Sequence, residues 1–108
     1  MTVYLVKSKP KKNIMKDLHT QLESGQISQL KPFGKVLHHG LQNAKIDDDN
    51  NKDGYAYWVE EDYCSPPLAI EREAVLDKYF DDISVEKVDE AQRGWERIRS
   101  KPLLWQQQ

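Results

Sequence analysis

The chain has 108 residues, the size of one domain, and 38% of them are apolar, with three Trp and five Tyr, which excludes a disordered chain. No run of about 18 apolar residues is present, so we expect no membrane-spanning helix, and the first residues do not form a secretion signal. The single cysteine excludes an internal disulfide, and we therefore expect a soluble protein of the reducing cytoplasm.

The formal net charge of −2 is divided unevenly along the chain. Residues 1–46 carry eight Lys and two acidic residues, a charge of +6, whereas residues 47–108 carry eight basic and sixteen acidic residues, a charge of −8. Such a division favours two solvated patches, or a partner with the complementary charge distribution, which includes a second copy of this chain. The basic cluster is Lys7, Lys9, Lys11, Lys12 and Lys16, and the acidic cluster is Asp47, Asp48, Asp49, Asp53, Glu60, Glu61 and Asp62.

The first two elements are predicted to be a strand and a helix. Residues 3–6 are apolar on both faces, which is typical of a central strand that is covered on both sides. Asn13 is predicted to cap a helix and Gly25 to end it. Between them, apolar side chains follow the helical spacing at Met15, Leu18 and Leu22.

Residues 35–46 fit two structures. Leu37, His39 and Leu41 alternate as in a strand, whereas a helix would place Leu37, Leu41 and Ala44 on one side. We prefer the strand, because Gly40 weakens a helix and a turn rich in Asp and Asn follows at 47–54.

The second half is predicted to contain a strand, a helix, a short strand and a last helix. Residues 54–59 form the clearest strand. Ser65 is expected to cap the next helix, followed by two prolines, and Asp89 with Gln92 to open the last one. The buried sides of the two helices are expected to be Leu68, Val75, Leu76 and Tyr79 in the first, and Ala91, Trp95 and Ile98 in the second, with the strand 83–85 between them.

The resulting order is βαββαβ followed by an extra C-terminal helix, which predicts an α+β domain of the ferredoxin-like type over residues 1–105, with a frayed tail at 106–108. In that architecture two helices cover one face of a four-stranded antiparallel sheet. We expect Val3, Leu5, Ala56 and Trp58 to lie beneath the helices, and Tyr4, Val6, Tyr55, Tyr57 and Val59 to lie on the second face, or the reverse.

Both faces of this sheet are too apolar to be left bare. The cover of the second face could be the tail of the chain, a second copy, or a ligand. The apolar residues available in the tail are Trp95, Ile98, Leu103, Leu104 and Trp105.

The sequence favours a non-catalytic binding or interaction module whose partner is itself or another protein. We expect no cofactor. If a pocket lies between the sheet and the tail, His38, His39 and Cys64 are the candidate lining residues.

A single-stranded RNA-binding domain is an alternative. Residues 3–8 resemble the second signature of the RNA-recognition motif, and residues 54–57 resemble its first. The resemblance implies that Tyr4, Tyr55 and Tyr57 stack on bases. Nucleic acid is nevertheless the less favoured partner, because Glu60 and Glu61 follow directly and carboxylates repel phosphates.

Residues 49–60 also match the pattern of an EF-hand calcium loop. Asp49, Asn51, Asp53 and Glu60 would supply side-chain oxygens and Tyr55 its carbonyl. The flanks do not fit, because no apolar residue precedes the loop and Pro66 and Pro67 interrupt the exiting helix, so we expect no metal site there.

A small cofactor-free enzyme is the third alternative. Dimeric ferredoxin-like domains include enzymes that use one histidine, here His38 or His39 as a base with Tyr57 and Cys64 nearby. No phosphate loop, metal-binding helix motif or nucleophile elbow is present, so the sequence gives catalysis no positive support.

Overall fold

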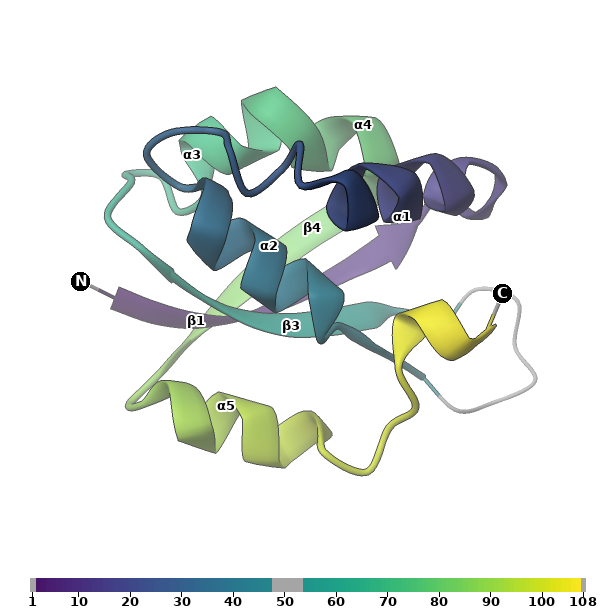
Figure 1. Cartoon of the computed structure of the whole chain (residues 1–108). Coiled ribbons are helices and arrows are strands. Elements are labelled where there is room, and N and C mark those ends of the chain that lie inside the picture. The colour runs from purple at the N-terminus through teal and green to yellow at the C-terminus, as the bar shows by residue number, and fades with distance from the viewer. Residues whose placement is uncertain (1, 48–53, 108) are drawn as a thin grey trace.

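The computed structural model describes residues 2–47 and 54–107, which form an α+β fold around a four-stranded antiparallel sheet (Figure 1). The strand order is β2-β3-β1-β4, so β1 lies between β3 and β4. The strands are β1 (Thr2–Pro10), β2 (Lys45–Ile46), β3 (Ala56–Asp62) and β4 (Phe80–Val88).

Helices cover both faces of the sheet. Those that follow β1 and β3 lie on one face, and α5 lies alone on the other, as Figure 1 shows. No helix in the described part of the chain is both long and apolar enough to cross a membrane. The helices are η1 (Lys12–Ile14), α1 (Met15–Ser24), α2 (Gly34–Gln42), α3 (Ala69–Glu71), η2 (Arg72–Leu76, a π-helix), α4 (Asp77–Tyr79), α5 (Ala91–Ile98) and η3 (Leu104–Gln107).

The first helix agrees with its sequence pattern. Met15, Leu18 and Leu22 are buried, and Gly25 ends α1 in the left-handed conformation, with φ 83°. The predicted cap was wrong: Ile14 is at the N-cap, no side chain caps the helix, and Asn13 lies in η1. The short 3-10 turn has shifted the start of the α-helix by one residue.

Residues 34–42 form a helix, so the preferred strand was wrong. Leu37 and Leu41 are buried one helical turn apart, and only Lys45 and Ile46 remain as a strand. Gly40 lowers the helix propensity of this segment, but its lack of a side chain allows α2 to pack closely on β3. A Cβ at this position would lie 2.9 Å from Cδ1 of Trp58 and 3.1 Å from the Val59 carbonyl oxygen.

The register between β1 and β3 corrects the expected faces. Tyr4 pairs with Glu60 and Val6 with Trp58, so Tyr4 and Val6 share the helix-covered face with Trp58. Our prediction had placed them on opposite faces. The alternation of side chains within each strand was predicted correctly. Which residues of two strands share a face depends on the register of their pairing, and the pattern of a single strand does not contain this information.

The cover of the second face is the tail of the chain. Ile98 of α5 is buried with Leu5 and Val59, and Gly94 approaches so closely that a Cβ would lie 2.7 Å from a methyl group of Val59. Trp95 also packs here. This confirms the first of the three expected covers for part of the face.

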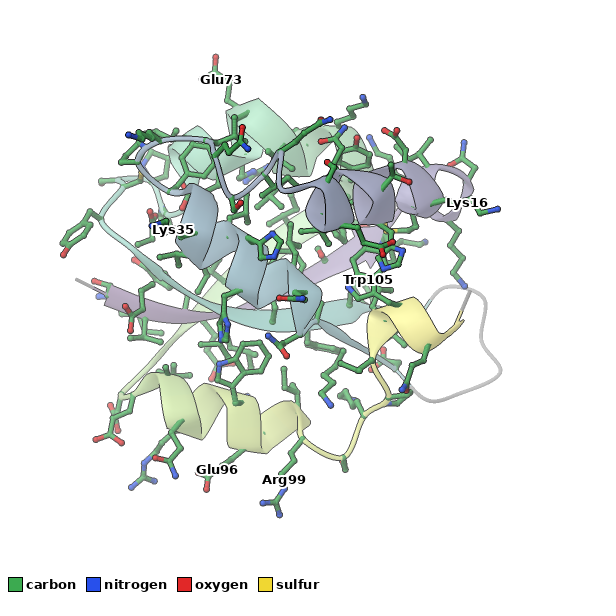
Figure 2. All side chains as sticks on the ribbon, in the orientation of Figure 1. Lys16, Lys35, Glu73, Glu96, Arg99 and Trp105 are labelled. Atoms are coloured by element: carbon green, nitrogen blue, oxygen red, sulfur yellow. The ribbon has the colours of Figure 1, made fainter. Side chains whose placement is uncertain are left out.

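The end of the chain passes around the β2 edge to the main core. The Ile46 N–H donates to the Pro102 carbonyl at 2.9 Å, and Leu104 is buried in the cluster beneath the helices. The Trp105 indole donates to the Leu41 carbonyl at 2.8 Å and stacks on His19 at 4.9 Å (Figure 2). Residues 104 and 105 therefore pack on the face opposite α5.

The remaining predicted helices have the expected buried sides but different starts. Leu68, Val75, Leu76 and Tyr79 are all buried. Ser65 is no cap. Instead, the Asp62 carboxylate accepts the Leu68 N–H at 2.6 Å, and α3 begins at Ala69. Likewise no side chain caps α5, whose N-cap is Glu90, so the predicted pair of Asp89 and Gln92 was wrong.

Candidate functional site

A groove runs between α2 and α5 beside the edge of β3. At its centre His39 of α2 meets Trp95 of α5 edge to face, with ring centroids 6.1 Å apart and an interplanar angle of 86°. Both residues line two adjoining hollows, of about 330 Å³ and about 350 Å³. The first hollow is also lined by Lys35, Val36, Val59, Glu60, Glu61 and Ala91, and the second by Asn43, Lys45, Gln92, Glu96, Arg99 and Leu103.

Charged side chains border the groove, with Lys35 on the α2 side and Glu96 and Arg99 on the α5 side. Figure 2 shows Lys35 at the first turn of α2, and Glu96 and Arg99 projecting outward from the α5 side. Val36 is 41% exposed, which is high for an apolar side chain. The floor and walls are thus apolar and aromatic, and the rim is charged, the arrangement common in protein-binding surfaces.

Strand β2 pairs only with Ala56 and Tyr57 of β3. From Trp58 onward, this edge of β3 therefore has no neighbouring strand in the described part of the chain. The Asp47 N–H donates to the Tyr55 carbonyl, so that carbonyl points toward β2. Carbonyls four and six residues further along the strand point the same way as that of Tyr55. The backbone groups of Val59 and Glu61 therefore face this edge; Gly40 of α2 lies against the Val59 carbonyl, so Glu61 is the position that faces the groove.

The two predicted histidines have different surroundings. His39 lies at the centre of the groove, whereas Nδ1 of His38 is buried and has no hydrogen-bond partner among the described residues. Both belong to α2 rather than to a strand. Cys64 lies elsewhere, in the loop after β3, so the three expected lining residues do not meet in one pocket.

The three tyrosines are divided between the faces of the sheet. Tyr4 is 7% exposed and lies beneath the helices. Tyr55 and Tyr57 lie on the other side, where Nζ of Lys7 is 4.4 Å from the Tyr55 ring centroid and Nζ of Lys101 is 5.0 Å from that of Tyr57. The structure brings together two of the three residues that the RNA-recognition resemblance implies.

A cluster of buried carboxyl groups lies at the end of β3, beneath α3. Glu60, Asp62 and Glu71 are 1%, 7% and 1% exposed, and Sγ of Cys64 lies 3.9 Å from Oε1 of Glu71. One oxygen of Glu60 accepts the Trp58 indole N–H at 2.9 Å, and the other is buried without a partner among the described residues. Sequence reasoning missed this cluster, although Glu60 and Asp62 continue the alternation of the buried Trp58.

Burial dominates the acid–base properties of the cluster. It raises the pKa of Glu60 to about 8, assisted by the neighbouring Glu71 and Asp62 carboxyl groups and opposed by the Trp58 hydrogen bond. Burial also raises the pKa of Glu71. The Ile70 backbone lowers the pKa of Cys64, but burial and the adjacent carboxylates outweigh it, and the net pKa is raised. The thiol is therefore not an activated nucleophile.

The expected calcium ligands Asp49, Asn51 and Asp53 lie outside the described residues. Glu60, which the loop pattern assigns as the bidentate ligand, points beneath the helices and is bonded to Trp58. The Tyr55 N–H is bonded to the Asp47 carboxylate at 3.0 Å. The structure thus assigns Glu60 to the buried cluster rather than to a loop at the surface.

Comparison with protein-family models, with curated proteins and with solved structures finds no match to this chain.

Proposed function

We propose that this protein is a non-catalytic interaction module that binds an extended segment of a partner protein in the groove between α2 and α5. The observation that carries this proposal is the position of the Trp95–His39 pair directly beside an unpaired edge of β3. An unpaired edge offers backbone donors and acceptors to an added strand, and a half-buried Trp is a frequent anchor of interfaces.

We further propose that the architecture is ferredoxin-like. Counted from β4, the strand order is β4-β1-β3-β2, with antiparallel neighbours throughout. Each helical connection therefore passes over one intervening antiparallel strand, which supports a split βαβ arrangement. The shortness of β2 is the departure that leaves β3 open.

The chemistry of the groove favours a particular kind of segment. Its backbone would pair with Glu61 and its apolar side chains would contact Val36 and Trp95, while charged side chains at its ends would face Lys35 and Arg99. Alternate side chains of an added strand point to opposite sides, here toward α2 and α5. The predicted motif is therefore a short apolar run whose successive residues face Val36 and Trp95 in turn, flanked by charged residues.

Selection from a library of randomised peptides tests the proposal. Wild-type protein should enrich peptides with such an apolar run, and Val36→Glu should weaken their binding by at least about tenfold, equivalent to about 1.4 kcal/mol. Ile70→Glu is the matched control, because Ile70 is 47% exposed and lines neither hollow of the groove. This control should bind like wild type.

Amide NMR separates strand addition from other contacts. On binding, the Glu61 N–H should shift downfield and exchange more slowly with solvent, and N-methylation of the peptide backbone should abolish binding although its side chains are unchanged. No enriched peptide, or equal binding by the methylated form, would contradict the proposal. If the bound segment belongs to a second copy, light scattering should show a dimer that Val36→Glu dissociates.

Single-stranded RNA is the second candidate, favoured by the pairing of Lys7 with Tyr55 and of Lys101 with Tyr57. Aromatic rings beside cations suit bases and phosphates. Short RNA should then quench tyrosine fluorescence at low salt, and Tyr57→Leu should reduce the effect, whereas Tyr4→Phe should not. Absence of quenching in wild-type protein would remove this candidate.

A further inference from the structure

Three potential metal ligands converge where β3 ends, independently of the groove. One carboxylate oxygen of Asp62, one of Glu71 and Sγ of Cys64 all lie within 4.8 Å of one another. They come from a strand, a loop and a helix, so their proximity depends on the tertiary fold. Asp62 retains a second oxygen beyond the one that accepts the Leu68 N–H.

The negative charge of this cluster is not balanced by any basic side chain in residues 2–47 and 54–107: none of Glu60, Asp62 and Glu71 makes an ion pair there. Buried carboxylates are normally paired or bound to a metal. Glu60 adds an independent observation, because its carboxyl group is buried beside those of Glu71 and Asp62 and its Oε2 has no hydrogen-bond partner among the described residues. A buried oxygen without a donor, beside two further carboxyl groups, would be satisfied by a proton or by a cation bound at this cluster.

We infer that Asp62, Cys64 and Glu71 bind a zinc ion, with the buried Glu60 carboxyl group beside them. Thiolate with carboxylate ligands favours zinc over calcium or magnesium, which prefer oxygen alone. Zinc bonds of about 2.0 Å to oxygen and about 2.3 Å to sulfur require the ligand atoms to approach by a small side-chain adjustment. Binding replaces the thiol proton, which is released to solvent.

Three protein ligands leave the fourth position to water. The ion would tie the end of β3 to α3 through the loop that carries Cys64. Zinc therefore stabilises the folded state, because the unfolded chain does not hold these ligands together.

Metal titration of chelator-treated full-length protein tests the inference. Cobalt, a spectroscopic substitute for zinc, should bind in a one-to-one ratio and give a thiolate-to-metal charge-transfer band, and zinc should displace it. Zinc should also raise the Tm of wild-type protein. Cys64→Ala should abolish the band and weaken zinc binding by at least about 100-fold, roughly the loss of one strong ligand.

Two further variants guard against misfolding as an explanation. Asp62→Asn keeps an acceptor for the Leu68 N–H but loses charge, so it should fold and bind zinc more weakly. Glu73→Gln removes an exposed carboxylate two residues from Glu71 and should bind like wild type. Far-ultraviolet circular dichroism confirms that each variant is folded.

The inference is overturned if wild-type protein binds no zinc at micromolar concentrations, or if folded Cys64→Ala binds it equally well. Cobalt binding without a charge-transfer band also overturns it, because the ligands would then be surface histidines or the acidic segment 47–54. Calcium should not compete with zinc, and competition would contradict the assigned thiolate ligand.

Discussion

The Trp58 indole donates its N–H to Oε1 of Glu60, two residues further along β3, and both side chains are almost completely buried. An ionised Glu60 would need a second hydrogen-bond donor, at Oε2. No described group donates to Oε2, and the neighbouring Glu71 carboxyl group cannot donate while it is ionised. A protonated Glu60 removes the conflict, because its O–H can donate to Glu71. The state of one proton therefore affects the packing of α3 on the sheet.

The first prediction is that metal-free protein loses stability as the pH rises. The pKa of Glu60 is raised from 4.5 to about 8 in the folded state. Below pH 4.5 the group is protonated in both states, and its contribution is complete. Above this value the unfolded chain loses its proton first, so the free energy of unfolding falls until about pH 8, by on the order of a few kcal/mol.

Urea denaturation at several pH values in the presence of a chelator measures this effect. Glu60→Gln keeps the acceptor for Trp58 and offers an N–H to Glu71, so its stability should depend less on pH and exceed that of wild type near pH 8. Glu61→Gln is the control and should retain the wild-type slope. A wild-type profile that is flat over this range would show that Glu60 is ionised in the folded state.

The second prediction concerns the hydrogen bond between Trp58 and Glu60. Trp58→Phe removes the donor and Glu60→Met removes the acceptor, and each should destabilise the fold. The double variant should lose about 1–2 kcal/mol less than the sum, because neither group is then left unpaired. Urea unfolding of the four proteins gives this coupling, and strict additivity would mean that the bond contributes nothing.

The spacing of apolar residues and the position of one glycine predicted two helices correctly, because both features involve only residues close in the sequence. The spacing of Met15, Leu18 and Leu22, followed by Gly25, sufficed for α1, because a helix and its left-handed stop involve neighbouring residues. The pattern of Ala91, Trp95 and Ile98 likewise identified the helix that covers the second face.

Features that depend on distant residues were not predictable in this way. Gly40 lowers helix propensity, but its role is visible only once Trp58 and Val59 lie beside it. The shared face of Val6 and Trp58 depends on strand register. The same limit applies to the candidate sites, since the groove requires two helices 50 residues apart to face each other, and the cluster requires Glu71 to lie over β3.

The third prediction is that Gly40→Ala destabilises the protein although alanine is the better helix former. The gain in propensity is about 1 kcal/mol, but the added methyl group would meet the immobile Trp58 ring at 2.9 Å and the Val59 carbonyl at 3.1 Å. Overpacking of this kind costs about 1–3 kcal/mol, so the net effect should be a loss. Thermal unfolding measures it, and the exposed Gln42→Ala in the same helix should be neutral or stabilising. An increase in Tm for Gly40→Ala would contradict the close packing of α2 on β3.

The fourth prediction tests the C-terminal segment as part of the core. Leu104 is 3% exposed beneath the helices, and its N–H donates to the Ala44 carbonyl at 2.8 Å. Leu104→Ala should therefore cost about 2–4 kcal/mol, the range for a buried leucine, whereas the exposed Gln106→Ala should cost nothing measurable. Because the same segment pairs with β2, hydrogen exchange at Ile46 should accelerate in Leu104→Ala but remain slow in Gln106→Ala. Equal stability of the two variants would mean that the fold is complete without its last turn, and that β2 does not depend on the segment packed against it.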